Sequence, residues 1–161
     1  MSAAPQLVIS TLNDLVDTLR TSHRKDFSGV LQRMHLPLSE LAGYCMWNDR
    51  RYTRNCIART TEFELLLICY GPGQRTSIHD YATEEAWIKP VMGSVIEERF
   101  RLVDNGGIEL FRSTVLEPGS VTHLSEGNSI HRYSNAGAER SATLNLYARP
   151  LLKWKVYEER I

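Results

Sequence analysis

The sequence predicts an all-β barrel of the jelly-roll type behind a helical cap. Two observations lead to this prediction. Apolar residues recur at helical spacing in the first 45 residues, and strand-like runs separated by turn residues follow from about residue 51. We therefore expect one domain over residues 1–161, with a cap over 1–45 and a barrel over 51–157.

The cap is predicted from three short segments. The first has apolar residues spaced i, i+3, i+4 and i+7, and Ser10 or Thr11 is placed to cap it. These apolar residues are Leu12, Leu15, Val16 and Leu19. A second helix is predicted from Phe27, Val30, Leu31 and Met34, and Pro37 opens a third segment.

The barrel is predicted from short runs that alternate with turn signals such as Gly71-Pro72-Gly73 and Asp104-Asn105-Gly106-Gly107. The runs cover 51–59, 62–70, 77–81, 86–92, 94–103, 108–116, 121–124, 129–133 and 142–147. About ten short strands at regular spacing are typical of a jelly roll or a related closed sheet.

Composition excludes several classes of protein. Lysine and arginine together number 19, as do aspartate and glutamate, so no basic surplus favours nucleic acid. No apolar run approaches the roughly 20 residues that span a bilayer, and the start resembles no secretory signal, so we expect a cytoplasmic protein. Cys45, Cys56 and Cys69 form no metal-finger spacing, and we expect three buried free thiols.

Two histidines stand out by their context. His79 and His131 each lie in a predicted strand that follows a turn containing glycine. Residues i and i+2 of a strand project to the same face, so Tyr81 should point the same way as His79. A group from a distant strand could then complete a site inside the barrel.

Four motifs together resemble those of the cysteine dioxygenases, a family of the cupin superfamily, in order and spacing. They cover roughly positions 40 to 150, and the two histidine contexts resemble the paired cupin motifs. The motifs are Arg51-Tyr52-Thr53-Arg54-Asn55, Tyr70-Gly71-Pro72-Gly73 through Ser77-Ile78-His79-Asp80, Ile130-His131-Arg132, and Leu144-Asn145-Leu146-Tyr147.

The resemblance implies a ligand set and a substrate site. In that family three histidines bind ferrous iron, two of them as His-x-His, and His79 and His131 match the first and third. Arg54 matches the arginine that grips the substrate carboxylate, with Tyr52 beside it as a substrate-binding residue. Tyr147 matches the active-site tyrosine near the oxygen-binding position.

Three positions depart from the family pattern. Tyr81 stands where the second histidine is expected, Ala86 where some members carry a cysteine that crosslinks to the tyrosine, and Asn145 where a histidine hydrogen-bonds that tyrosine. Tyr81 is our preferred third ligand. Glu85 is an alternative, because the general cupin motif places a ligating glutamate nearby, and it could equally begin a strand at the surface.

The function that these residues imply is oxidation of a small thiol, most simply L-cysteine or a close relative, by O₂ at a metal. Fe(II) is the expected metal, and Ni(II) is an alternative because it binds N/O sites more tightly than ferrous iron. Two other readings stay open: a divergent oxidase that gives a rearranged product, and a cupin that binds a small acid without turnover. We expect no nucleic-acid or membrane partner, and the sequence leaves the oligomeric state open.

Overall fold

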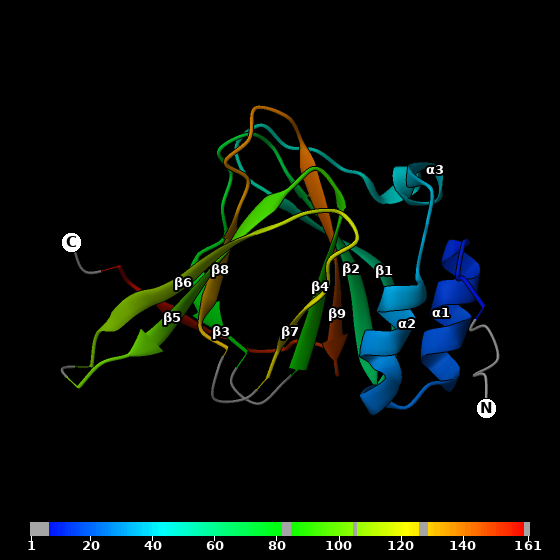
Figure 1. The fold of residues 1–161 in the computed structure, drawn as a ribbon, viewed down its shortest axis with the longest axis horizontal. Helices are drawn as coiled ribbons and strands as arrows, with labels where there is room; N and C mark the ends of the chain where they lie inside the picture. Colours follow the sequence, from blue (N-terminus) through cyan, green and yellow to red (C-terminus); the bar gives the residue numbers. More distant parts are fainter. Residues whose placement is uncertain (1–6, 82–84, 105, 126–128, 160–161) are drawn as a thin grey trace, which may run out of the picture.

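Two five-stranded sheets form the body of the protein, and three short helices cover one of them (Figure 1). The computed structural model describes residues 7–81, 85–104, 106–125 and 129–159. The helical elements are α1 (Leu12–Thr21), η1 (Arg24–Asp26), α2 (Phe27–Arg33), α3 (Leu38–Leu41) and η2 (Ala42–Tyr44). The strands are β1 (Thr53–Arg59), β2 (Phe63–Tyr70), β3 (Ile78–Asp80), β4 (Glu85–Met92), β5 (Val95–Leu102), β6 (Ile108–Leu116), β7 (Thr122–Leu124), β8 (His131–Ser134), β9 (Ser141–Ala148) and β10 (Lys155–Tyr157).

The strand order confirms the predicted all-β architecture. One sheet runs β1-β2-β9-β4-β7 and the other β10-β3-β8-β5-β6. Each of the nine predicted runs contains an observed strand, with ends that differ by two residues or fewer. The sequence analysis missed β10, whose three residues are largely exposed and pair with β3.

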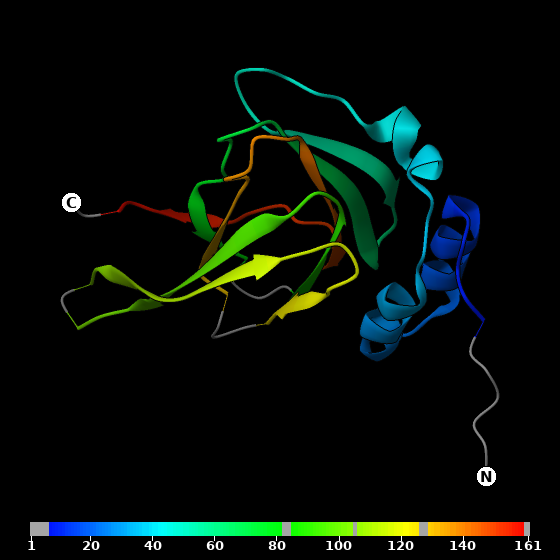
Figure 2. The same cartoon turned by 45° about the horizontal axis from the view of Figure 1, so that its top comes forward.

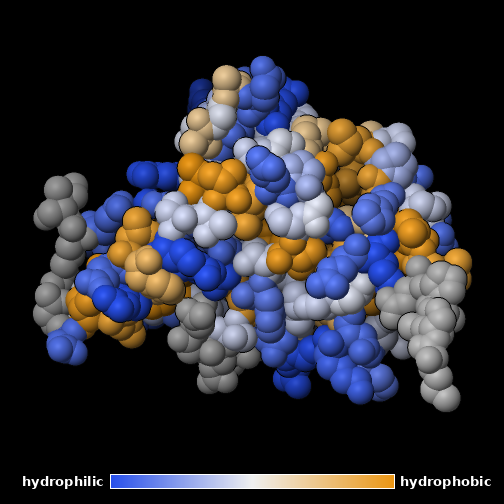
Figure 3. All heavy atoms as spheres, viewed as in Figure 1, coloured by the Kyte–Doolittle hydropathy of each residue, from blue (hydrophilic) through white to orange (hydrophobic). Residues whose placement is uncertain are grey.

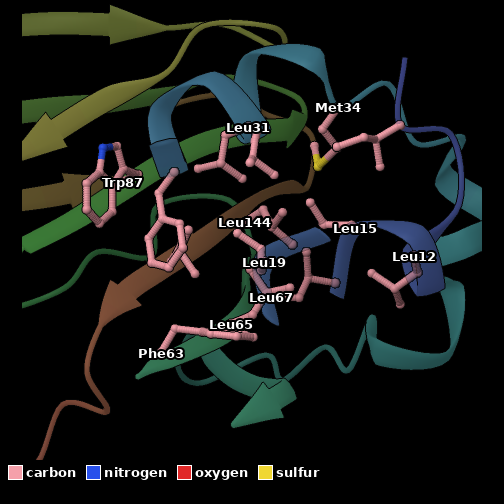
Figure 4. Packing of buried hydrophobic residues seen from close by; sticks show 14 of the residues in the cluster. Leu12, Leu15, Leu19, Leu31, Met34, Phe63, Leu65, Leu67, Trp87 and Leu144 are labelled. Carbon is pink, nitrogen blue, oxygen red and sulfur yellow. The ribbon is translucent and has the colours of Figure 1, made fainter. Parts of the chain in front are cut away.

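The cap packs on the outer face of the first sheet. The Thr11 side chain accepts a hydrogen bond from the Asp14 backbone N–H at 3.1 Å, which identifies Thr11 rather than Ser10 as the N-cap of α1. Leucines of α1 and α2 meet the outward residues of β2 and β9 in one apolar cluster, part of which is drawn in Figure 4. Turning the molecule shows the helices on the same side of the barrel (Figure 2).

Both faces of the first sheet are covered, which explains why every residue of β2 and β9 is buried. Along β2, Leu65 and Leu67 face the helices, while Leu66 and Ile68 face the second sheet. The same alternation places every second residue of β9 inside the barrel. These inward positions of β9 are Thr143, Asn145 and Tyr147.

A buried lysine joins the cap to the barrel. Lys89 of β4 is 4% exposed, and its ammonium donates hydrogen bonds to the backbone carbonyls of Leu31 at 2.6 Å and Met34 at 2.7 Å. These carbonyls lie at the C-terminal end of α2, where backbone N–H partners run out, and the Leu31 carbonyl also accepts from the Met34 N–H at 3.3 Å. Burial lowers the pKa of Lys89.

Gly93, with φ of +59°, links β4 to β5. A Cβ at this position would lie 2.8 Å from the carbonyl oxygen of Arg140, closer than real Cβ contacts. The turn therefore requires glycine. The β5–β6 hairpin that follows extends away from the barrel (Figure 1). At this end of the molecule, apolar and polar side chains are both exposed on the surface (Figure 3).

Among the described residues, no helix is long and apolar enough to cross a membrane.

The prediction of three buried thiols is wrong for two of them. Cys69 is buried, Cys45 is partly buried and Cys56 is exposed, because β1 lies at the edge of its sheet. All three cysteines are free.

Candidate metal and substrate site

His79 and His131 lie directly opposite each other on β3 and β8, with ring centroids 4.3 Å apart. The Nδ1 of His79 lies 2.7 Å from the carbonyl oxygen of Ser77, and the Nδ1 of His131 makes the same type of contact with the carbonyl of Ser129. A carbonyl only accepts, so each Nδ1 carries the proton and donates it. Each Nε2 therefore keeps its lone pair.

Tyr81 brings an oxygen to the same point. Its side chain is 3% exposed, and its hydroxyl lies 3.3 Å from Nε2 of His79 and 3.2 Å from Nε2 of His131. The Tyr81 side chain therefore points into the barrel, as strand alternation predicted. Three donor atoms from residues 79, 81 and 131 converge inside the barrel.

Tyr81 cannot donate a hydrogen bond to both histidines at once. Two buried imidazole lone pairs face one phenol, and a phenol has a single proton to donate. Without a cation, at least one Nε2 remains a buried acceptor with no donor from Tyr81, which costs free energy. A metal ion would instead be bound by the two Nε2 lone pairs and the phenol oxygen together. Metal-binding imidazoles typically donate a hydrogen bond through their other ring nitrogen, as both Nδ1 atoms do here.

Few described side chains lie close enough to His79 and His131 to share a metal ion with them. Among the residues that the structure describes, no group of three or more His, Cys, Asp or Glu side chains could hold a metal. The phenol oxygen of Tyr81 is the polar side-chain atom that lies close to both imidazole nitrogens. Two nitrogens and one oxygen suit a first-row transition metal such as iron or nickel.

Burial sets the charge state of the site before any metal binds. It lowers the pKa of His79 and holds that of His131 well below its usual value, with the neighbouring His79 adding to the effect at His131. Burial also raises the pKa of Tyr81 well above its usual value. Both imidazoles are consequently neutral and available as ligands at neutral pH.

Tyr147 approaches the site from the opposite sheet. Its hydroxyl lies 3.4 Å from that of Tyr81, and Asn145 donates to it through Nδ2 at 3.3 Å. The Thr143 hydroxyl donates to Oδ1 of Asn145 at 2.7 Å, which fixes the orientation of the amide. Ala86 pairs directly with Tyr147 across β4 and β9, so no side chain at that position can crosslink to the tyrosine.

Arg54 of β1 lies next to Tyr147. Its guanidinium carbon lies 5.8 Å from the ring centroid of Tyr147 and 5.4 Å from that of Trp154. Arg54 is exposed, because β1 is an edge strand. No carboxylate of the described residues forms an ion pair with Arg54, so its guanidinium is available to an anion.

Tyr52 lies beside this arginine on the barrel wall. It is half-buried and stacks on Tyr70, with centroids 5.7 Å apart and 24° between the rings. Tyr70 is completely buried and faces the same interior cluster as Tyr81 and Tyr147. A substrate-binding role for Tyr52 stays a prediction.

Glu85 does not reach the site. Its carboxylate lies 3.4 Å from Nε of Arg24 and 3.4 Å from Nε2 of His123, on the helix side of the first sheet. Ala86, its neighbour, is the residue that points into the barrel. Glu85 therefore begins strand β4, which was the alternative to a ligand role. Its side chain points toward Arg24 and His123, away from the two histidines, so it is not a ligand.

A buried ion pair next to His131 was missed by the sequence analysis. Glu97 and Arg99 are 1% and 2% exposed, and Nε of Arg99 lies 2.9 Å from Oε1 of Glu97. Tyr133 donates its hydroxyl hydrogen to Oε2 of Glu97 at 2.6 Å, and its ring centroid lies 5.2 Å from that of His131. The sequence of Val95–Leu102 predicts a strand, but three consecutive charged residues in it do not indicate that Glu97 and Arg99 are buried.

Trp154 was also missed. It lies between β9 and β10 and is 46% exposed, and its ring faces the guanidinium of Arg54. A lone tryptophan close to the end of the sequence carries no signal of this contact, which only the pairing of β10 with β3 brings about.

Comparison with known sequences shows which family the chain resembles. The family Cysteine dioxygenase type I matches residues 1–160. A protein of Danio rerio named Cysteine dioxygenase type 1 is 26% identical over 161 residues, an alignment that covers 93% of this chain and 80% of the relative.

Comparison with solved structures shows the fold. A Klebsiella pneumoniae protein with a double-stranded β-helix domain superposes with a TM-score of 0.62 at 15% identity, covering 74% of this chain and 89% of the other. A cupin superfamily protein of Desulfitobacterium hafniense gives a TM-score of 0.51 at 15% identity, covering 68% and 88%. The barrel is thus a cupin barrel.

Proposed function

The chain belongs to the cysteine dioxygenase type I family and is a cysteine dioxygenase-like enzyme of the cupin superfamily. From that premise, we propose that it oxidises the sulfur of L-cysteine or a close relative with O₂ at a transition metal. The observation that carries this proposal is the convergence of His79, His131 and Tyr81 on one point inside the barrel.

His79, His131 and Tyr81 would hold the metal, with Fe(II) the first choice and Ni(II) the alternative. When bound, the metal supplies a thiolate by coordination at neutral pH and the redox chemistry that O₂ requires. Burial keeps both imidazoles neutral. Hydrogen bonds from their Nδ1 atoms to the carbonyls of Ser77 and Ser129 orient the rings.

Arg54 binds the substrate carboxylate in this proposal. Its guanidinium has no carboxylate partner among the described residues, and a planar guanidinium matches a carboxylate in two parallel hydrogen bonds. Its position over the rings of Tyr147 and Trp154 orients the guanidinium at the edge of the site. The carboxylate would then hold the thiol end of the substrate toward the three ligands.

Tyr147 holds a proton at a defined place. Its oxygen accepts from Asn145, whose amide is fixed by Thr143, so its own hydrogen points away from Asn145. The neighbouring acceptor in that direction is the oxygen of Tyr81, 3.4 Å away, or a substrate atom between them. Asn145 does not titrate, so this hydrogen bond persists across the physiological pH range.

The phenol of Tyr81 favours one second candidate function. A phenolate is an anionic ligand where the family has a neutral imidazole, and it would lower the net charge at the metal by one unit. A changed charge shifts both redox potential and metal preference. The same scaffold could then give a rearranged product from a cysteine-like thiol instead of a sulfinate.

The three free cysteines, none in a disulfide, support placing the protein in a reducing compartment such as the cytoplasm. Cysteine and O₂ are then its proposed small-molecule partners. We propose no nucleic-acid or membrane partner.

The test is product analysis. Protein loaded with Fe(II), and separately with Ni(II), is given L-cysteine in air, and thiol loss and products are followed by mass spectrometry. We expect a product that contains O₂-derived oxygen, and we expect His131→Ala to abolish it. A sulfinate identifies the dioxygenase reaction, and a rearranged product the second candidate. No turnover with either metal would leave a cupin that binds a small acid without reaction.

Tyr81 is tested in the same assay. Tyr81→His restores the family's three-histidine set and should shift the product toward sulfinate, whereas Tyr81→Phe removes the oxygen donor and should lower metal retention. Tyr157→Phe is a matched control, because its hydroxyl binds Asp80 outside the site. Unchanged metal content, rate and product in Tyr81→Phe would remove Tyr81 from the ligand set.

A further inference from the structure

A second candidate site lies between the helical cap and the first sheet. A cavity of about 440 Å³ is lined by residues from the end of β9, the turn before β2 and the start of α2. Figure 1 shows these elements next to one another. The cavity walls come from α1, the η1 turn, the β1–β2 turn and the residue after β9. None of the proposed metal ligands lines it, and it faces the cap rather than the barrel interior.

The walls of this cavity carry an excess of positive charge. Arg20, His23, Arg24 and Arg149 line it, and Glu62 is the one acid among the described lining residues. Three of them lie within residues 20–24, and Arg149 comes from the residue after β9. The tertiary fold therefore adds Arg149 to a basic stretch at the end of α1 and the start of η1.

The ion pairs of these arginines leave the charge available. Arg20 meets Asp17 at 3.9 Å on the same helix, and both side chains are more than half exposed. Arg24 meets Glu85 at 3.4 Å through Nε, with both side chains partly in solvent. Exposed pairs of this kind are worth little and are readily exchanged for a better anion.

Arg149 adds a backbone observation. It is the one non-glycine residue of the described chain with a positive φ, at 76°, and its N–H donates to the carbonyl of Glu62 at 2.7 Å. An L-residue in this left-handed conformation costs on the order of 1 kcal/mol relative to glycine. The chain carries an arginine at a position that glycine would suit better, and that arginine lines the cavity.

We propose that this cavity binds a phosphate group, free or as the ester of a small metabolite, through Arg20, Arg24 and Arg149. Guanidinium groups bind phosphate oxygens in pairs, and several cations are needed to balance a dianion. The cavity volume falls within the range of small-molecule sites. Because the walls join cap and barrel, bound phosphate holds the two together. This inference does not rest on the proposed thiol oxidation.

The test is a pair of titrations on the metal-loaded protein, with sodium phosphate in one arm and ribose 5-phosphate in the other. Binding is measured by calorimetry and by the rise in melting temperature, against sodium chloride at equal ionic strength. We expect saturable binding in at least one arm. Tighter binding of the ester than of free phosphate identifies an ester site, and the reverse identifies a free-phosphate site.

Three variants separate this site from other effects. Arg149→Gly should lower phosphate affinity about tenfold or more, while leaving the melting temperature in chloride unchanged or raised, because the strained φ is relieved. Arg24→Gln should also weaken binding, and Arg50→Ala, an exposed arginine outside the cavity, should not. His131→Ala should leave phosphate binding unchanged, which excludes phosphate at the metal.

Two results would overturn the inference. One is equal binding in native protein and in both Arg149→Gly and Arg24→Gln, which would mean a nonspecific salt effect. The other is the absence of saturable binding in both arms.

Discussion

At the scale of single residues, the site depends on where three polar atoms meet. The sequence predicted His79, Tyr81 and His131 because the motif spacing and strand alternation are local properties. It could not predict that Arg54 is exposed or that Glu85 turns toward Arg24 and His123. Those outcomes depend on which strand lies at the edge and which face the helices cover, and neither is a local property.

The first residue-scale prediction concerns pH. Burial lowers the pKa of both His79 and His131 in the folded protein, whereas in the unfolded chain each titrates near 6.5. Below about pH 6.5 the unfolded state therefore binds more protons, so the free energy of unfolding falls as pH falls, by up to about 1.4 kcal/mol per pH unit for each histidine.

Urea unfolding of chelator-treated protein at pH 7.5 and pH 5.5 measures this dependence. His131→Asn should flatten it, and His35→Asn, which changes an exposed histidine, should not. A pH dependence identical in native protein and in His131→Asn would contradict the role given to burial.

The second residue-scale prediction concerns Arg54. Arg54→Ala should raise KM for L-cysteine about ten- to a hundredfold, because a hydrogen-bonded charge contributes about 1.5–3 kcal/mol. Cysteamine, which lacks the carboxylate, should be a poor substrate with either protein. Steady-state kinetics on both thiols decide this, with Arg51→Ala as the control for an exposed neighbouring arginine. Equal losses on both thiols would mean that Arg54 acts on something other than the carboxylate.

At the scale of elements, the register of the first sheet explains how cap and site are linked. β4 and β9 send alternate residues to the helices and to the interior, so Lys89 reaches the end of α2 while Ala86 faces Tyr147. The sequence predicted these strands because their apolar runs are long and bounded by turns. It missed β10, since Lys155–Tyr157 is short and its pairing with β3 depends on the folded barrel.

The prediction at this scale is a stability change. Lys89→Met keeps the aliphatic length but leaves the carbonyls of Leu31 and Met34 without their buried donor. We expect a loss of about 2 kcal/mol in the free energy of unfolding, measured by denaturant titration. Lys25→Met, at an exposed position, is the control. A loss no larger than that of the control would show that the contact contributes nothing net.

At the scale of the whole molecule, the candidate site exists only when both sheets are in place. The two histidines lie on β3 and β8 of one sheet, and Tyr147 and Arg54 lie on β9 and β1 of the other. The order of strands brings them together across the barrel, which no stretch of sequence encodes by itself. The family resemblance made it possible to predict which residues belong to the site. It did not predict the buried ion pair of Glu97 and Arg99 beside the site.

The central claim is that three donors converge to hold one metal ion. Elemental analysis of protein loaded with Fe(II) or Ni(II) and then desalted tests it most directly. The account predicts about one metal per chain, a sharp loss in His79→Ala and in His131→Ala, and full occupancy in Arg54→Ala. Full occupancy in both histidine variants, or no retained metal in the native protein, would contradict it.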